Sequence, residues 1–141
     1  MTSERLDNLV KIQKLKLEPP AKAELEGLVR SAVARIKDAE NQSLSIESRF
    51  DLAYNAAHAF ALAALRYHGY RSENRYLVFQ TLQDTLQLPQ PQWRVLDQAH
   101  QKRNLSEYEG DVDVDAKLVD AVIRVAREVE KRLAQLPALP D

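Results

Sequence analysis

Polar side chains gather on one face of the segment around residue 100. On a helix, which turns about 100° per residue, eight residues fall within roughly 140° of one another: Trp93, Leu96, Asp97, His100, Arg103, Asn104, Glu107 and Tyr108. This face changes from apolar to densely polar along its length, and burying such polar side chains without partners is costly. The segment therefore forms either a satisfied polar network or a site that meets a charged ligand.

Other residue types that carry chemistry are sparse. The absence of cysteine excludes a disulfide, a thiolate zinc site and a cysteine nucleophile. The three histidines, His58, His68 and His100, include no pair at the spacing that places two metal ligands on one helix face. A glycine-rich phosphate loop and a serine elbow are also missing. We expect no metal and no cofactor, and we expect His58 and His68 to be structural, as hydrogen-bonded core or capping residues.

An acidic triplet, Asp111, Asp113 and Asp115, follows Gly110. A calcium loop that began at Asp111 would need glycine at its sixth position and glutamate at its twelfth, where this chain has alanine and valine. Carboxylates are favoured at helix starts by capping and by the helix dipole. One of the three is therefore expected to cap a long last helix.

The composition is that of a single globular domain, residues 1–141. Its 20 Lys and Arg and 21 Asp and Glu give a formal net charge of −1, spread nearly evenly along the chain. At this length one apolar core suffices without a disulfide or a structural metal. The longest apolar run, residues 59–65, is too short to span a membrane, and residues 1–14 lack the apolar stretch of a signal peptide. We expect a cytoplasmic protein without membrane contact.

Few glycines and abundant Ala, Leu, Glu, Gln, Lys and Arg predict an all-α fold, an up-and-down bundle of about five or six helices. Breaks at proline, glycine and polar clusters place the helices at 4–16, 21–40, 46–68, 73–87 and 91–107, with the last one after residue 110. Residues 46–68 are alanine-rich and are expected to form the central helix. Ser72 is expected to cap the fourth helix, with Tyr76, Phe79, Leu82 and Leu86 facing inward.

The chain resembles the HEPN domains, which are small helical bundles. Their signature is an arginine followed by a polar residue, then a histidine a few positions later. The segment His100-Gln-Lys-Arg103-Asn104-Leu-Ser-Glu-Tyr108 is similar to the subgroup whose motif ends in tyrosine. The alanine-rich helix that ends in Gly69-Tyr70-Arg71 is also similar to the family. The resemblance covers residues 46–136, and leaves the N-terminal helices, 1–42, and a short tail, 137–141, outside it.

The resemblance implies a homodimer in which both motifs border one cleft, and metal-independent ribonuclease chemistry. The arginine, here Arg103, would stabilise charge on the phosphate, and the histidine would transfer a proton. Tyr108 stands where that histidine is expected, and a phenol with a pKa near 10 is a poor base at neutral pH. His100, one turn before Arg103, is the candidate substitute. The candidate catalytic residues are Arg103, His100 and Tyr108, and the candidate RNA-binding residues are Asn104, Lys102, Glu107 and Arg75.

Three functions remain open. The first is a dimeric module that contacts RNA or a nucleotide-bearing partner with weak or absent ribonuclease activity. The second is an active ribonuclease toxin with a small nucleotidyltransferase-type partner protein. The third is a structural interaction bundle, which the near-neutral charge favours, unless a local basic patch forms in space. The residues available for such a patch are Arg66, Arg71, Arg75, Arg94, Lys102 and Arg103. Arg75 either approaches the same cleft or lies in the solvated first turn of the fourth helix.

Overall fold

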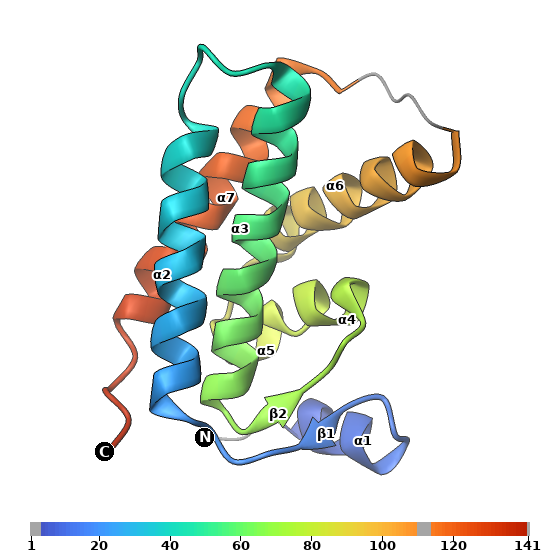
Figure 1. Ribbon diagram of the computed structural model, residues 1–141. Helices are drawn as coiled ribbons and strands as arrows, with labels where there is room; N and C mark the ends of the chain where they lie inside the picture. Colours follow the sequence, from blue (N-terminus) through green and yellow to red (C-terminus); the bar gives the residue numbers. More distant parts are fainter. Residues whose placement is uncertain (1–3, 110–113, 141) are drawn as a thin grey trace.

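The computed structural model describes residues 4–109 and 114–140, and for residues 106–109 only the backbone is described. The chain folds as an all-α bundle with a two-stranded ribbon at one end (Figure 1). The elements are α1 (Glu4–Lys11), β1 (Lys16–Leu17), α2 (Lys22–Ala39), α3 (Ile46–Tyr67), β2 (Tyr70–Arg71), α4 (Arg75–Gln80), α5 (Leu82–Thr85), α6 (Gln90–Glu109) and α7 (Ala116–Ala134). Within the described residues, no helix combines the length and apolar character of a membrane span.

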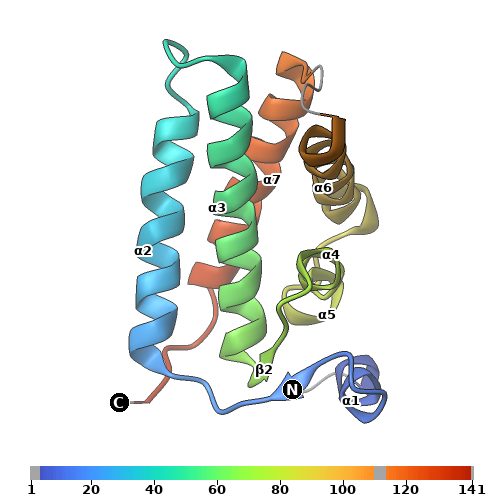
Figure 2. The ribbon, with the colours of Figure 1, turned by 45° about the vertical axis from the view of Figure 1, so that its right-hand side comes forward.

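Helix α3 is the centre of the bundle, as the sequence predicts. Helices α2 and α7 pack along it, and α4 and α6 lie on the side of α3 away from α2 (Figures 1 and 2). Seven alanines of α3 are buried, and their small side chains let the neighbouring helices approach closely: Ala53, Ala56, Ala57, Ala59, Ala61, Ala63 and Ala64. Ser45 caps the helix by accepting a hydrogen bond from the backbone amide of Ser48.

The N-terminal segment differs from the prediction of a helix over residues 4–16. Helix α1 ends at Lys11 because Gln13 adopts a left-handed backbone, with φ of 63°, and Leu15 N donates back to Leu9 O. The chain then forms β1, which pairs antiparallel with β2. The strands were not predicted because each is two residues long, too short for an alternating pattern.

The predicted fourth helix is divided into α4 and α5. Asn74, not Ser72, caps α4 by accepting from the amide of Leu77. The helix is interrupted at Thr81, whose buried hydroxyl donates to the carbonyl oxygen of Val78. Phe79, Leu82 and Leu86 are buried as expected, whereas Tyr76 is 41% exposed. The prediction that Tyr76 faces inward is therefore wrong.

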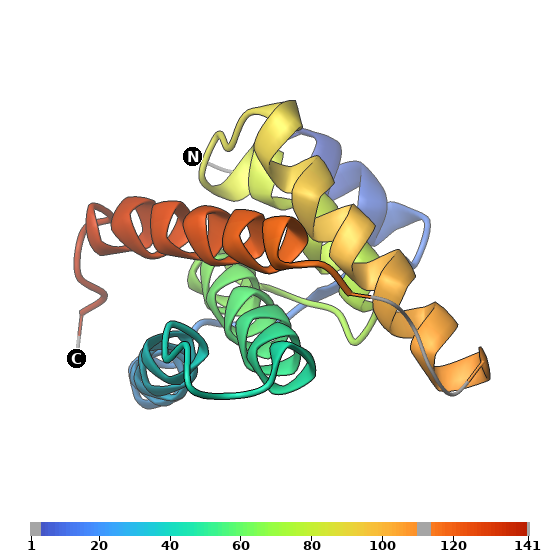
Figure 3. The ribbon, with the colours of Figure 1, turned by 90° about the horizontal axis from the view of Figure 1, so that it is seen from above.

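The apolar face of helix α7 packs against other parts of the same chain. Asp115 caps it by accepting from the amide of Leu118, which confirms one of the three predicted carboxylates; Asp111 and Asp113 lie outside the described residues. Its buried residues Val119, Ile123 and Ala126 belong to the core. Viewed from above, α6 crosses α7 and its C-terminal part extends beyond the other helices (Figure 3).

Candidate functional site between α3, α4 and α6

Tyr54 lies in the middle of the candidate site. It comes from α3, is fully buried, and packs against the rings of Phe50 and Phe79, with centroids 6.3 Å and 5.7 Å away. Its ring also stacks on the imidazole of His100 from α6, at 6.2 Å. One tyrosine thus connects the core to the helices that carry the predicted polar residues.

Both ring nitrogens of His100 contact neighbouring side chains. The Tyr54 hydroxyl lies 2.8 Å from His100 Nδ1, and Asn104 Nδ2 lies 3.2 Å from His100 Nε2. An amide nitrogen only donates, so Nε2 accepts and Nδ1 carries the proton that it donates to the tyrosine oxygen. His100 is therefore well oriented, and it must give up one of these hydrogen bonds before it exchanges a proton with a substrate.

Two arginines from different helices converge on Tyr54. Cζ of Arg103 in α6 lies 5.0 Å from the centre of the tyrosine ring, and Cζ of Arg75 in α4 lies 5.5 Å from it. Arg75 also donates to Asn55 Oδ1 at 3.0 Å, and Asn55 Nδ2 donates to the carbonyl oxygen of Asp51. A neutral amide and an aromatic ring thus hold Arg75, and these contacts leave its positive charge in place.

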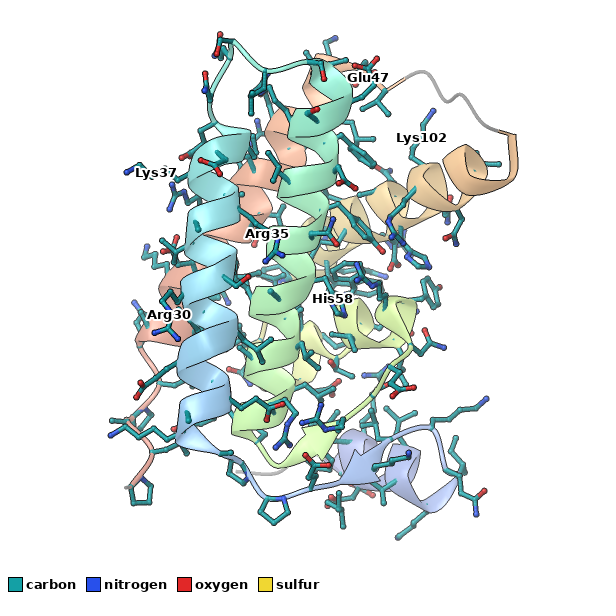
Figure 4. The ribbon with its side chains drawn as sticks, in the orientation of Figure 1. Arg30, Arg35, Lys37, Glu47, His58 and Lys102 are labelled. Atoms are coloured by element: carbon teal, nitrogen blue, oxygen red, sulfur yellow. The ribbon has the colours of Figure 1, made fainter. Side chains whose placement is uncertain are left out.

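His58 lies beneath this cluster, on the side of α3 that faces α4 and α6 (Figure 4). Its ring contacts Phe79 edge to face at 6.0 Å. Burial, together with the nearby positive charges of Arg75 and Arg103 and the electrostatic interaction with His100, lowers the pKa of His58 to about 4. Among the described residues, His58 Nε2 is buried without a hydrogen-bond partner, so the prediction of a hydrogen-bonded core histidine is wrong for this atom. It is a neutral imidazole at pH 7.

The other histidine, His68, has the structural role that the sequence predicts. Its Nε2 lies 3.1 Å from the carbonyl oxygen of Thr85, and this contact joins the end of α3 to the end of α5. The ring is half-buried, and burial lowers its pKa.

The structure brings together four of the candidate residues predicted from the sequence: Arg75, His100, Arg103 and Asn104. Lys102 lies on another side of α6, where it borders a groove towards Leu118 of α7 (Figure 4). Glu107 and Tyr108 belong to α6, but their side chains lie outside the described part of the chain.

The six basic residues considered as one patch are divided. Arg66 and Arg71 lie at the β2 end of α3, where both form ion pairs with Glu18 and Glu24. Arg66 is also buried, with 1% of its surface exposed. These two arginines stabilise the fold, whereas Arg75 and Arg103 lie beside the ring of Tyr54.

Sequence reasoning missed three residues of the cluster, Tyr54, Asn55 and His58. All three come from α3, whose alanines drew attention to packing. A signal was present, because Tyr54 and His58 are four residues apart and share a face of a mostly apolar helix. Polar groups placed in this way need partners on a neighbouring helix, and α4 and α6 supply the surrounding side chains.

Two grooves lie away from this cluster. A mostly apolar groove of about 430 Å³ runs between α2 and the end of α7, bordered by Leu25, Val29, Tyr67 and Leu136. A groove of about 710 Å³ lies between α6 and α7, and charged residues of both signs, Glu40, Arg124 and Arg127, border it. Neither contains a convergent set of hydrogen-bonding and titratable groups like the one at Tyr54. Chemistry, not cavity size, identifies the candidate site.

What the cluster can do follows from its groups. Two guanidinium groups and neutral amide donors suit an anion with several oxygens, such as a phosphate. Within the described residues, no group of three or more carboxylates and histidines is arranged to hold a metal ion. Comparison of the chain with protein-family models, with curated proteins and with solved structures gave no match, so the function is inferred from this geometry and from the sequence.

Proposed function

We propose that the protein is a HEPN-like helical module that binds RNA through the face formed by α3, α4 and α6. The observation that carries this proposal is the convergence of Arg75 and Arg103 on Tyr54, next to His100 and Asn104. Guanidinium groups bind phosphate oxygens in a bidentate manner, and most protein contacts to nucleic acids are to the phosphate and sugar. Two such groups from different helices suit the backbone of an RNA strand.

The surroundings of Arg75 distinguish it from arginines that serve the fold. Arg66 pairs with Glu24, and Arg127 pairs with Glu40, so these positive charges are compensated inside the protein. Arg75 is held by Asn55 and by an aromatic ring. An amide orients the guanidinium without competing with a phosphate for its charge.

We propose that ribonuclease activity is weak or absent. A metal-independent ribonuclease needs a group that exchanges a proton near neutral pH. His100 is engaged at both ring nitrogens, and His58 is buried, with a pKa of about 4. Tyr108, in the position of the motif histidine, is a phenol and a poor base.

The resemblance of residues 46–136 to HEPN domains extends the proposal to assembly. We propose a cytoplasmic homodimer in which the two faces border one cleft, with a small nucleotidyltransferase-type protein as partner in a toxin–antitoxin or stress-response system. Sedimentation equilibrium of the purified protein tests the dimer, and a purely monomeric protein would contradict it. The structural-bundle alternative treats the same contacts as an internal network and predicts no RNA binding.

Fluorescence anisotropy with a short labelled single-stranded RNA tests the binding proposal. The variants are Arg103→Ala and Arg75→Ala, and the control is Arg30→Ala on α2, on the opposite side of α3 (Figure 4). We expect each site variant to weaken binding about tenfold and to reduce the salt dependence, because a charged contact to phosphate is lost. The control should change affinity by less than about twofold.

The same samples are incubated with total RNA without added metal. Intact RNA with Arg-dependent binding supports the proposed module. Cleavage that disappears in Arg103→Ala would establish the ribonuclease alternative. Absence of binding by the unmodified protein, or equal binding by all variants, would overturn the proposal and favour the structural bundle.

A further inference from the structure

We infer that Tyr54 is the positioning residue of this RNA-binding face. Its ring holds the guanidinium groups of Arg75 and Arg103, and its hydroxyl fixes the orientation and tautomer of His100. This inference rests on the proposed function and deepens it, because it identifies the side chain that arranges the groups that contact the ligand.

The ring of Tyr54 is held firmly in place. It is fully buried and lies in contact with Phe50 on its own helix and with Phe79 on α4. Close packing of this kind leaves a side chain little freedom to change its rotamer. A fixed ring can therefore serve as a reference point for more mobile side chains.

The arginines need such a reference point. An arginine side chain has several rotatable bonds, and ordering it on binding costs free energy. Cζ atoms at 5.0 Å and 5.5 Å from the ring centre lie within the range of a cation–π interaction. Tyr54 thus orders Arg75 and Arg103 before a ligand arrives. The free energy of binding therefore does not include the cost of ordering these two side chains.

The hydroxyl has a separate task. His100 Nδ1 lies 2.8 Å from Tyr54 Oη, while the amide nitrogen of Asn104 donates to Nε2. The two contacts together favour the neutral tautomer protonated at Nδ1. Removal of the hydroxyl takes away the group that accepts the Nδ1 proton, so the Nε2-protonated form becomes accessible when the Asn104 amide rotates.

These two roles are separated by substitutions that keep the size of the ring. Tyr54→Phe removes the hydroxyl and keeps the aromatic face. A pentafluorinated phenylalanine at position 54 keeps nearly the same shape as phenylalanine but reverses the charge distribution of the ring, which turns cation–π attraction into repulsion. Phe60, buried on the same helix, accepts the same fluorinated residue as a control for packing.

The first readout is anisotropy with the labelled single-stranded RNA. We expect the fluorinated residue at position 54 to bind about fivefold to tenfold more weakly than Tyr54→Phe, since two arginines lose their support. Fluorination at Phe60 should leave affinity unchanged. Equal affinities of Tyr54→Phe and its fluorinated counterpart would overturn the role of the ring.

The second readout needs no ligand. Nitrogen-15 chemical shifts of the His100 ring report its tautomer, and circular dichroism verifies the helical fold of each variant. We expect the Nδ1-protonated tautomer to dominate in the unmodified protein and to lose population in Tyr54→Phe. An unchanged tautomer would overturn the role of the hydroxyl.

If the unmodified protein binds no RNA, the proposed function fails and the role of Tyr54 at an RNA site fails with it. Binding that is indifferent to position 54 removes only the role of Tyr54.

Discussion

The Arg66 guanidinium donates to the Glu24 carboxylate at 2.9 Å and joins α3 to α2. The same guanidinium donates to the carbonyl oxygens of Glu18, Pro19 and Tyr70. Arg66 is 1% exposed, so one buried side chain ties the connection before α2 and the start of β2 to the central helix. This explains why a basic residue can occupy the end of an apolar helix without forming part of a surface patch.

The first prediction concerns Arg66→Met, which keeps the length and apolar stem of the side chain but removes its charge and donors. Three carbonyl oxygens lose this donor and Glu24 loses one of its two arginine partners, so we expect the free energy of unfolding to fall by about 3 kcal/mol. Arg35→Met is the control, because Arg35 is exposed on α2 and should change stability by less than about 0.5 kcal/mol. Urea denaturation measures both, and equal small effects would contradict the structural role of Arg66.

The second prediction concerns the pH dependence that His58 imposes. Burial, with the positive charges of Arg75 and Arg103 and the electrostatic interaction with His100, lowers the pKa of His58 from 6.5 to about 4 in the folded protein. The unfolded chain therefore binds the proton first as the pH falls. The contribution of neutral His58 to the free energy of unfolding is fully present above pH 6.5. It is lost progressively between pH 6.5 and about 4, by about 3 kcal/mol in total. Below about pH 4 both states are protonated, and the loss levels off.

His58→Gln removes this titration and keeps a polar side chain. Its free energy of unfolding should decrease less steeply than that of the unmodified protein between pH 6.5 and 4. Urea titrations at several pH values provide the measurement. Parallel pH profiles of the two proteins would show that His58 does not carry the expected dependence.

The third prediction concerns Asp97, whose effect on stability changes with pH in the direction opposite to that of His58. Burial raises the pKa of Asp97 from 3.8 to about 6, although the charge of Arg94 lowers it in part, and Asp97 Oδ1 has no hydrogen-bond partner among the described residues. The folded state therefore binds this proton before the unfolded chain, and stability from this group rises as the pH falls from about 6 towards 3.8. At neutral pH, Asp97→Asn should increase the free energy of unfolding by about 1 kcal/mol, after allowance for solvent screening. Thermal unfolding at pH 7 and at pH 4 measures it, and a stabilisation that is equal at both pH values would contradict this origin.

The sequence predicts the fold well where a pattern is local. The alanine-rich central helix and the capping carboxylate at Asp115 follow from composition and from helix-start chemistry, and the structure confirms both. The end of α1 depends on the left-handed backbone of Gln13, and β1 depends on pairing with residues far along the chain. Neither has a local signature, because glutamine is an ordinary helix residue and the strands are too short for periodicity.

The candidate site is predictable only in part for a related reason. Helical spacing correctly places His100, Arg103 and Asn104 on one face of α6. This spacing does not show which helix packs against that face of α6, so Tyr54 and His58 were not predicted as site residues. The exposure of Tyr76 also could not be anticipated, since helical spacing does not show how much of that face of α4 the neighbouring elements cover. Contacts between helices decide the composition of the site.

The last prediction concerns the start of α7, the helix that completes the core against α3. Asp115 Oδ1 accepts from Leu118 N at 2.8 Å, and its negative charge lies at the positive end of the helix dipole. Asp115→Ala should lower the free energy of unfolding by about 1 kcal/mol, and Asp115→Ser, which keeps the cap but not the charge, should lower it by about half as much. Glu26→Ala, at an exposed position within α2, controls for the loss of an acidic residue. Urea denaturation ranks the variants, and a loss at Glu26 as large as that at Asp115 would assign the effect to overall charge and not to the cap.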